Sequence, residues 1–144
     1  MHGLRDNLEI RYVNAPVAAG ASIDDNSTRV DMADAESVLF MVPIADSVDT
    51  GVATLAVESN DADSDTGMTA ITGAVATATS GANDDLNGTM LMVEVRHPAK
   101  RYVQAVVTSA AANIAYGATV AIIKPRRVPA VQGATVQASA YVSG

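Results

Sequence analysis

Apolar and polar residues alternate over short stretches of this chain, with a period of two. The alternation is clearest in residues 89–97, TMLMVEVRH, and it recurs in residues 52–59, VATLAVES. A period of two predicts half-buried β-strands, because successive side chains of a strand point to opposite faces of a sheet. Met90 and Met92 fall on the more polar side of their segment, where they could form a contact patch; we favour ordinary packing.

Other strands are predicted from continuous apolar runs. Residues 38–42, VLFMV, are apolar throughout, which is typical of a strand covered on both faces. Pro43 then argues against a long helix. Residues 114–123, IAYGATVAII, form a similar run with a bulge expected at Gly117. The pair Asn87-Gly88 favours a tight hairpin turn, because both residues tolerate a positive φ.

Turn signals separate these segments at fairly even intervals. Further strands are expected at residues 9–13, 27–32, 68–79 and 100–108. The pattern predicts an all-β fold, a jelly-roll or β-sandwich of about eight short antiparallel strands. We expect residues 1–21 to form an N-terminal arm, 22–129 the sandwich domain and 130–144 an uncharged C-terminal tail. Such arms can add a strand to a neighbour's sheet.

Composition fits one domain with an unusual core. The chain has 144 residues and 49% apolar residues, but only one Phe and no Trp. Cores of Ala and Val suit two facing sheets and bury less area per residue than aromatic cores do. We therefore expect the stability of the fold to depend partly on partner subunits.

Charge is unevenly distributed along the sequence. The net charge is −7; eleven of the sixteen acids lie between Asp24 and Asp65, and six of the nine basic residues lie between Arg96 and Arg127. An acidic chain disfavours direct binding of nucleic acid, and no run is long enough for a membrane helix. A local basic patch could be solvated surface or could dock on an acidic partner. The candidate docking residues are Arg96, Lys100, Arg101, Lys124, Arg126 and Arg127. We expect the acidic loops to face outward, away from that docking side.

The stretch ESNDADSDTG, residues 58–67, resembles the start of a calcium loop. Counted from Asp61, however, the sixth position is Thr66 where such loops need Gly, and the twelfth is Thr72 where they need Glu. We therefore interpret the stretch as an exposed polar loop. Whether the carboxylates of Asp61–Asp65 hold a cation more loosely is left open.

No catalytic motif stands out. The nucleophile elbow, the phosphate-binding loop and the dinucleotide fingerprint are absent. There is no cysteine, and His2 and His97 have no evident cluster of ligands around them. We expect no enzyme activity, no cofactor and no metal site.

Several short segments together resemble the capsid cement or decoration proteins of tailed bacteriophages. They are Ser22-Ile23-Asp24, Glu36–Phe40, Leu55–Asp65, Lys100–Val103 and Ile122–Pro129. The resemblance implies a jelly-roll that binds the outer capsid surface as a homodimer or homotrimer. It would bridge subunits of the major capsid protein in the virion, after assembly in the bacterial cytoplasm. Thr66-Gly67-Met68 stands where the family often has an aromatic residue, and the tail after Val131 has no counterpart.

Two other functions remain open. The first is a tail-tube or head–tail connector protein, which is also a β-rich virion component. The second is a secreted carbohydrate-binding or adhesin module. The scarcity of aromatic residues for sugar stacking and the absence of a signal peptide at the start of the sequence argue against the second.

Overall fold

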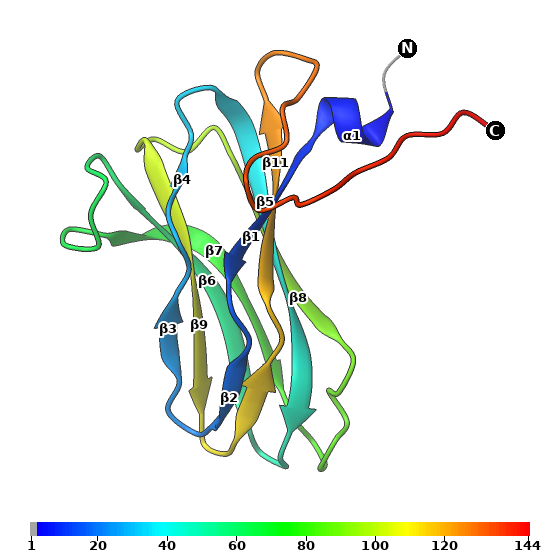
Figure 1. Cartoon of the computed structure of the whole chain (residues 1–144). Coiled ribbons are helices and arrows are strands. Elements are labelled where there is room, and N and C mark those ends of the chain that lie inside the picture. The colour runs from blue at the N-terminus through cyan, green and yellow to red at the C-terminus, as the bar shows by residue number, and fades with distance from the viewer. Residues whose placement is uncertain (1–2) are drawn as a thin grey trace.

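The computed structural model describes residues 3–144 and confirms the all-β prediction (Figure 1). Within these residues there are one four-residue helix, α1 (Leu4–Asn7), and eleven strands. The strands are β1 (Glu9–Asn14), β2 (Val17–Gly20), β3 (Asp24–Asn26), β4 (Val30–Asp31), β5 (Ala35–Ser47), β6 (Val52–Asn60), β7 (Thr69–Thr79), β8 (Met90–Arg96), β9 (Tyr102–Ala110), β10 (Ile114–Tyr116) and β11 (Thr119–Pro125).

Two antiparallel sheets pack face to face. The first contains β1, β2, β5, β8, β10 and β11, and the second contains β3, β4, β6, β7 and β9. Three strand positions of the fold are each divided into two segments. These are β1 with β2, β3 with β4, and β10 with β11, and the two segments of each pair follow one another along the same neighbouring strand position. When each divided pair is counted once and the positions are numbered along the chain, the fold has eight strand positions. Their order is 1-8-3-6 in the first sheet and 2-7-4-5 in the second. This is a jelly-roll arrangement.

The core lies between the sheets and consists mainly of Val, Ala and Ile. Its two largest fully buried residues after Tyr116 are Phe40 of β5 and Ile44 of the same strand. The second sheet contributes Leu55 of β6, and every second residue of β6 is buried. The alternation in the sequence therefore identifies the inner face of each sheet correctly.

The expected N-terminal arm is wrong for residues 9–20. Strand β1 pairs along its length with β11, and β2 pairs with β10. Val13 is buried in the core. Pro16 interrupts the strand only locally, because the chain resumes pairing one residue later. This segment is therefore part of the sandwich.

Pro43 lies within a strand, and one turn prediction, at Asn87-Gly88, needs correction. Strand β5 continues through Pro43, because the peptide of Pro43 faces the break between β10 and β11, where Gly117 N–H donates to the Pro43 carbonyl at 2.9 Å. The Asn87-Gly88 pair is not a hairpin, since β7 and β8 belong to different sheets. It instead ends a longer crossover loop, with Gly88 at φ 76°. At Gly117, where a bulge was predicted, the strand is interrupted more fully: it divides into β10 and β11.

Tyr116 connects the two sheets. It belongs to β10 in the first sheet, and its hydroxyl donates to the Thr108 carbonyl and accepts from the Thr54 N–H, both in the second sheet. Burial raises the pKa of the Tyr116 phenol to about 12. The hydroxyl of Tyr116 thus satisfies two backbone groups of the second sheet, the Thr54 N–H of β6 and the Thr108 carbonyl of β9.

Residues 130–144 contain no helix or strand and run alongside α1 (Figure 1). Gln132 Oε1 accepts from the Ile10 N–H at 2.9 Å, and Thr135 Oγ1 accepts from the Tyr12 N–H at 3.2 Å. These side chains cap the free edge of β1, which would otherwise expose unpaired donors. Within the described residues, no helix has the length and apolarity needed to cross a membrane.

Candidate functional site: an apolar sheet face and a charged end

The outer face of the first sheet carries an apolar patch that spans all four strand positions. The exposed Glu94 of β8 borders it beside Leu39, and Lys124, Ser37 and Arg96 form the row beyond. We call the patch the apolar face and define it by side chains that point away from the core on β1, β5, β8 and β11. They are Ile10, Tyr12, Leu39, Met41, Pro43, Met90, Met92, Val120 and Ile122. In register, Tyr12, Val120, Met41 and Met92 form one row across the sheet.

This face is open to solvent. Tyr12 is 47% exposed, and Met90 and Met92 are 47% and 52% exposed. Our expectation that the two methionines pack in the ordinary way is therefore wrong. The run Val38–Val42 was expected to be covered on both faces, but in the single chain only its inner side chains are buried, while Leu39 and Met41 stay partly exposed.

The outer face of the second sheet has a different composition. We call it the threonine face, because Thr54, Thr77 and Thr108 dominate its centre. Thr54 Oγ1 and Thr77 Oγ1 lie 3.2 Å apart in a cross-strand hydrogen bond. Val75 is the one large apolar side chain there that is strongly exposed, at 54%. Hydroxyls directed outward suit contact with water.

The basic residues predicted for docking gather at one end of the sandwich, and several are held in ion pairs. Arg96 and Lys124 both contact the carboxylate of Glu36, at 3.2 and 3.3 Å. The hydrogen bond from Lys124, together with the nearby charges, lowers the pKa of Glu36. Much of the positive charge of these two side chains is therefore matched locally.

Lys100 and Arg101 directly precede β9 at the same end. Arg101 donates two hydrogen bonds to Asp31, at 2.9 and 2.8 Å, which lowers the pKa of Asp31 and raises that of Arg101. This is the bidentate geometry that gives arginine–carboxylate pairs their specificity. Lys100 makes no ion pair among the described residues and donates to Thr69 Oγ1 at 2.9 Å.

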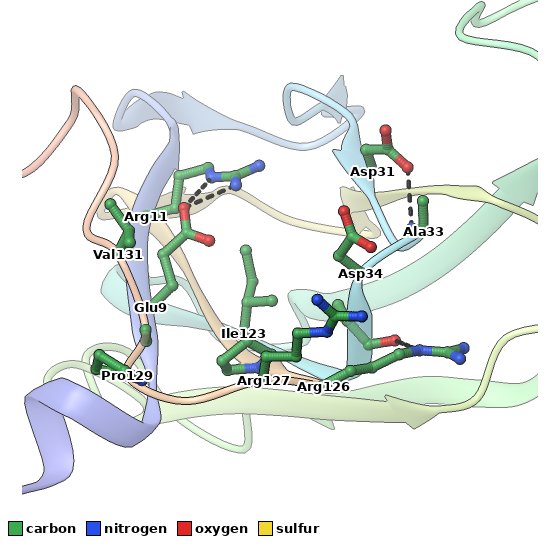
Figure 2. Close-up of a pocket in the computed structure, with 13 residues that line it drawn as sticks. Glu9, Arg11, Asp31, Ala33, Asp34, Ile123, Arg126, Arg127, Pro129 and Val131 are labelled. Carbon is green, nitrogen blue, oxygen red and sulfur yellow. Dashed lines mark hydrogen bonds and ion pairs between the residues drawn. The ribbon is translucent and has the colours of Figure 1, made fainter. Parts of the chain in front are cut away.

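Arg126 and Arg127 line a hollow of about 850 Å³ that opens between the sheets at this end (Figure 2). Arg126 donates to the Ala35 carbonyl at 3.3 Å. Neither arginine makes an ion pair with any described residue. Asp34 and Asp31 line the same hollow from the turn before β5 and from β4, and the Arg11–Glu9 pair lines it from β1. The hollow therefore offers charges of both signs, with two guanidinium groups unpaired.

Of the acidic stretch 58–67, expected to be an exposed loop, residues 58–60 instead end β6, where Ser59 and Asn60 are buried, and residues 61–68 form the loop between β6 and β7. Asn60 organises it by donating to the carbonyls of Ser64 and Thr66, at 2.8 and 2.9 Å. Asp63 and Asp65 bind Arg29, at 2.6 and 2.8 Å. An arginine thus occupies the position between carboxylates that a cation would take, and no metal-ligand cluster exists among residues 3–144.

The two ends of the sandwich differ in charge. The acidic end comprises the loops β2–β3, β5–β6, β7–β8 and β9–β10, joined by hydrogen bonds such as Val48 N–H to the Asn113 carbonyl. With the adjoining β3 and the last residues of β5 it carries six aspartates and no Lys or Arg: Asp24, Asp25, Asp46, Asp49, Asp84 and Asp85. The opposite half, which we call the mixed end, holds all nine basic residues and the other ten acids, a net charge of −1.

One expectation about orientation is therefore wrong. We expected the acidic loop 58–67 to face away from the basic residues. The jelly-roll topology instead places the β6–β7 loop beside the β4–β5 and β8–β9 connections, at the mixed end. The separation of charge along the sequence becomes local pairing in space, and the unpaired acids are those of the other end. His97 is exposed at the mixed end, while His2 lies outside the described residues.

No protein-family model matches the sequence, and no curated protein matches it at a significant level. Among solved structures, the chain is similar to the PBSX exported protein XepA, with a TM-score of 0.56 and 14% identity over 100% of this chain and 45% of XepA. A structure of infectious bursal disease virus, strain Gt, gives a TM-score of 0.46 and 11% identity over 83% of this chain and 32% of the other. A CBM4 structure gives 0.40 and 9%, over 84% and 88%.

The chain thus spans less than half of the XepA chain that it matches. At this level of identity, the likeness concerns the path of the backbone and not the residues that bind or react. Together with the strand order described above, it establishes the fold: the chain is a jelly-roll β-sandwich, similar in structure to XepA.

Proposed function

We propose that the protein is a structural virion component that binds the outside of a phage capsid and stabilises it by bridging subunits of the major capsid protein. The observation that carries this proposal is the mixed end, where Arg126 and Arg127 lie unpaired around a hollow. Guanidinium groups on a segment stiffened by Pro125 and Pro129 are suited to binding carboxylates of a partner surface. The sequence resemblance to cement proteins and the jelly-roll fold support the same function.

Bridging follows from weak contacts made in parallel. Exposed charge pairs contribute little individually, but several copies that each contact two shell subunits gain from effective concentration. Such a protein needs surfaces for association and no reacting groups. The mixed end would face the shell, and the acidic end would point outward.

Co-sedimentation with shells of the major capsid protein tests the proposal. Wild-type protein should pellet with shells, and the double variant Arg126→Glu/Arg127→Glu should bind at least about tenfold more weakly, because it removes two charge-assisted contacts. Arg5→Glu is the control, since it reverses a charge on α1 outside the hollow. Unchanged binding of the double variant would exclude the docking role, and rings or tubes of purified protein in electron micrographs would favour the tail-tube or connector function instead.

A further inference from the structure

The apolar face is composed of residue types that are usually buried, although its side chains are open to solvent. Val38, Phe40 and Val42 already fill the inner side of β5, so Leu39 and Met41 are not needed for the core of the single chain. Solvent-facing positions of antiparallel strands normally carry polar residues, as the threonine face does. The apolar residues on the outside of β5, β8, β1 and β11 therefore indicate a cover that the single chain does not supply.

The size of this face matches an interface. It is four strand positions wide and about three outward residues deep, roughly 19 Å by 20 Å, or on the order of 400 Å² in flat projection. Monomeric proteins rarely leave a larger contiguous apolar patch exposed. An apolar groove beside β1, lined by Leu4, Leu8, Ile10, Ile122 and Val136 among others, continues the patch past the sheet edge. Because Ile10 and Ile122 line both, the face and the groove form one continuous apolar surface, which can supply the apolar core of an interface whose partners each contribute about 800 Å².

We propose that this cover is the apolar face of a second copy of the chain, packed sheet on sheet about a two-fold axis that runs along the strands. Two sheets pack with their strands nearly aligned, and this axis places β1 over the partner's β8 and β11 over its β5. The row of Tyr12, Val120, Met41 and Met92 then meets itself in reverse order.

The reversed row is complementary in size. Tyr12 meets Met92, a sulfur–aromatic contact, and the smaller Val120 meets Met41. In the next row Ile122 meets Leu39, and at the border of the contact Glu94 of the edge strand β8 lies over Ile10. The Arg96–Glu36–Lys124 group lies at the rim, where ion pairs stay hydrated.

This arrangement has an electrostatic signature. Both acidic ends lie on the same side of the dimer, so their aspartates repel one another, and both mixed ends lie on the other side. Salt shortens the range of that repulsion to about 8 Å at physiological ionic strength. Raising the salt concentration should therefore strengthen the dimer, in contrast to an interface built from ion pairs. The proposal concerns the protein alone and does not depend on binding to a shell.

Sedimentation equilibrium of the purified chain tests the proposal, with two matched variants. Wild type should form a dimer, and Met92→Glu on the apolar face should raise the dimer dissociation constant at least about 100-fold, because it buries a charge without a partner. Val75→Glu, a similarly exposed site on the threonine face, should leave the constant unchanged. Circular dichroism should show both variants folded. A monomeric wild type, or an equal effect of both variants, would overturn the proposal.

Cross-linking reports the orientation, because the chain has no cysteine of its own. A short bis-maleimide spanning about 10 Å, the distance between packed sheets, should join Tyr12→Cys chains to Met92→Cys chains in a mixture. Either variant alone should remain uncross-linked, since identical positions would lie roughly 14 Å apart across the sheet in addition to that gap. Cross-linking of Tyr12→Cys to itself, without mixed product, would contradict the proposed axis.

Discussion

The two outer faces of the sandwich differ more than the two inner faces do. Inward, both sheets present Val, Ala and a few larger residues, among them Phe40 and Leu55. Outward, one sheet presents Leu, Ile and Met, and the other presents a row of threonines, two of which, Thr54 and Thr77, are joined by a hydrogen bond between their hydroxyls. The inner residues account for folding in both sheets. The outer contrast therefore indicates where the molecule meets other proteins.

The largest effect on the free energy of unfolding should come from substitutions in the core, to which the two sheets contribute equivalent side chains. Phe40→Ala in the first sheet and Leu55→Ala in the second remove fully buried side chains. Each should lower the free energy of unfolding by about 2–5 kcal/mol, since a cavity remains in addition to the lost burial. Urea denaturation followed by circular dichroism measures this. If only one variant were destabilised, the two inner faces would not form one core.

The next effect concerns the hydroxyl that joins the sheets. In the unfolded chain a tyrosine titrates near 10, but the folded pKa of Tyr116 is about 12. Because the folded pKa is raised, the stabilisation of the fold by the neutral Tyr116 phenol is complete below pH 10 and is lost as the pH rises from 10 towards 12. The full loss is on the order of 3 kcal/mol.

Unfolding free energies measured between pH 8 and 11.5 test this. Wild type should lose stability across that range, and Tyr116→Phe should lose much less. Tyr12→Phe, on the apolar face and 47% exposed, should retain the wild-type loss. Equal pH profiles for all three proteins would mean that the buried hydroxyl does not connect the sheets energetically.

A smaller effect compares the outer faces directly. Leu39→Thr gives the apolar face a residue of the other face, and Val75→Thr makes the same kind of change on the threonine face. Under conditions where the chain is monomeric, both should change the unfolding free energy by about 1 kcal/mol or less, because neither side chain is fully buried. Only Leu39→Thr should weaken self-association, measured by light scattering. Equal weakening by both would remove the distinction between the faces.

The smallest effect concerns metal. Calcium or a chelator should leave the melting temperature unchanged, because Arg29 already pairs with Asp63 and Asp65. Arg29→Ala should increase hydrogen exchange in the β6–β7 loop with little change in melting temperature, as expected for an exposed pair. A chelator-induced fall in melting temperature of the wild type would reveal a cation site that this arrangement argues against.

The local pattern of apolar and polar residues is sufficient to predict much of the fold. Alternation in residues 52–59 and 89–97 located β6 and β8 within one or two residues, since a strand with one buried face must alternate. Gly117 marked the break between β10 and β11. The pattern was insufficient for residues 9–20, because an edge strand that is interrupted by Pro16 resembles an irregular arm until its partner strand is known.

The candidate surfaces were predictable only in part. The continuous run from Val38 to Val42 correctly indicated two apolar faces, yet sequence could not tell which face the chain itself covers. Met90 and Met92 were assigned to packing for the same reason. The sequence also suggested a division between acidic and basic halves. Folding brings Asp31 to Arg101 and Glu36 to Arg96 and Lys124, so that division is largely cancelled.

What the sequence determined by itself is the class of fold, the inner faces of the strands and the absence of a calcium loop of the common type, because each depends on residues close together in the chain. The tertiary structure alone decided which outward residues share a face, which charges are paired and which end holds unmatched aspartates. Those properties depend on strand order and register, which bring together residues as distant as Tyr12 and Met92. The surface on which we base self-association exists only once four strands lie side by side.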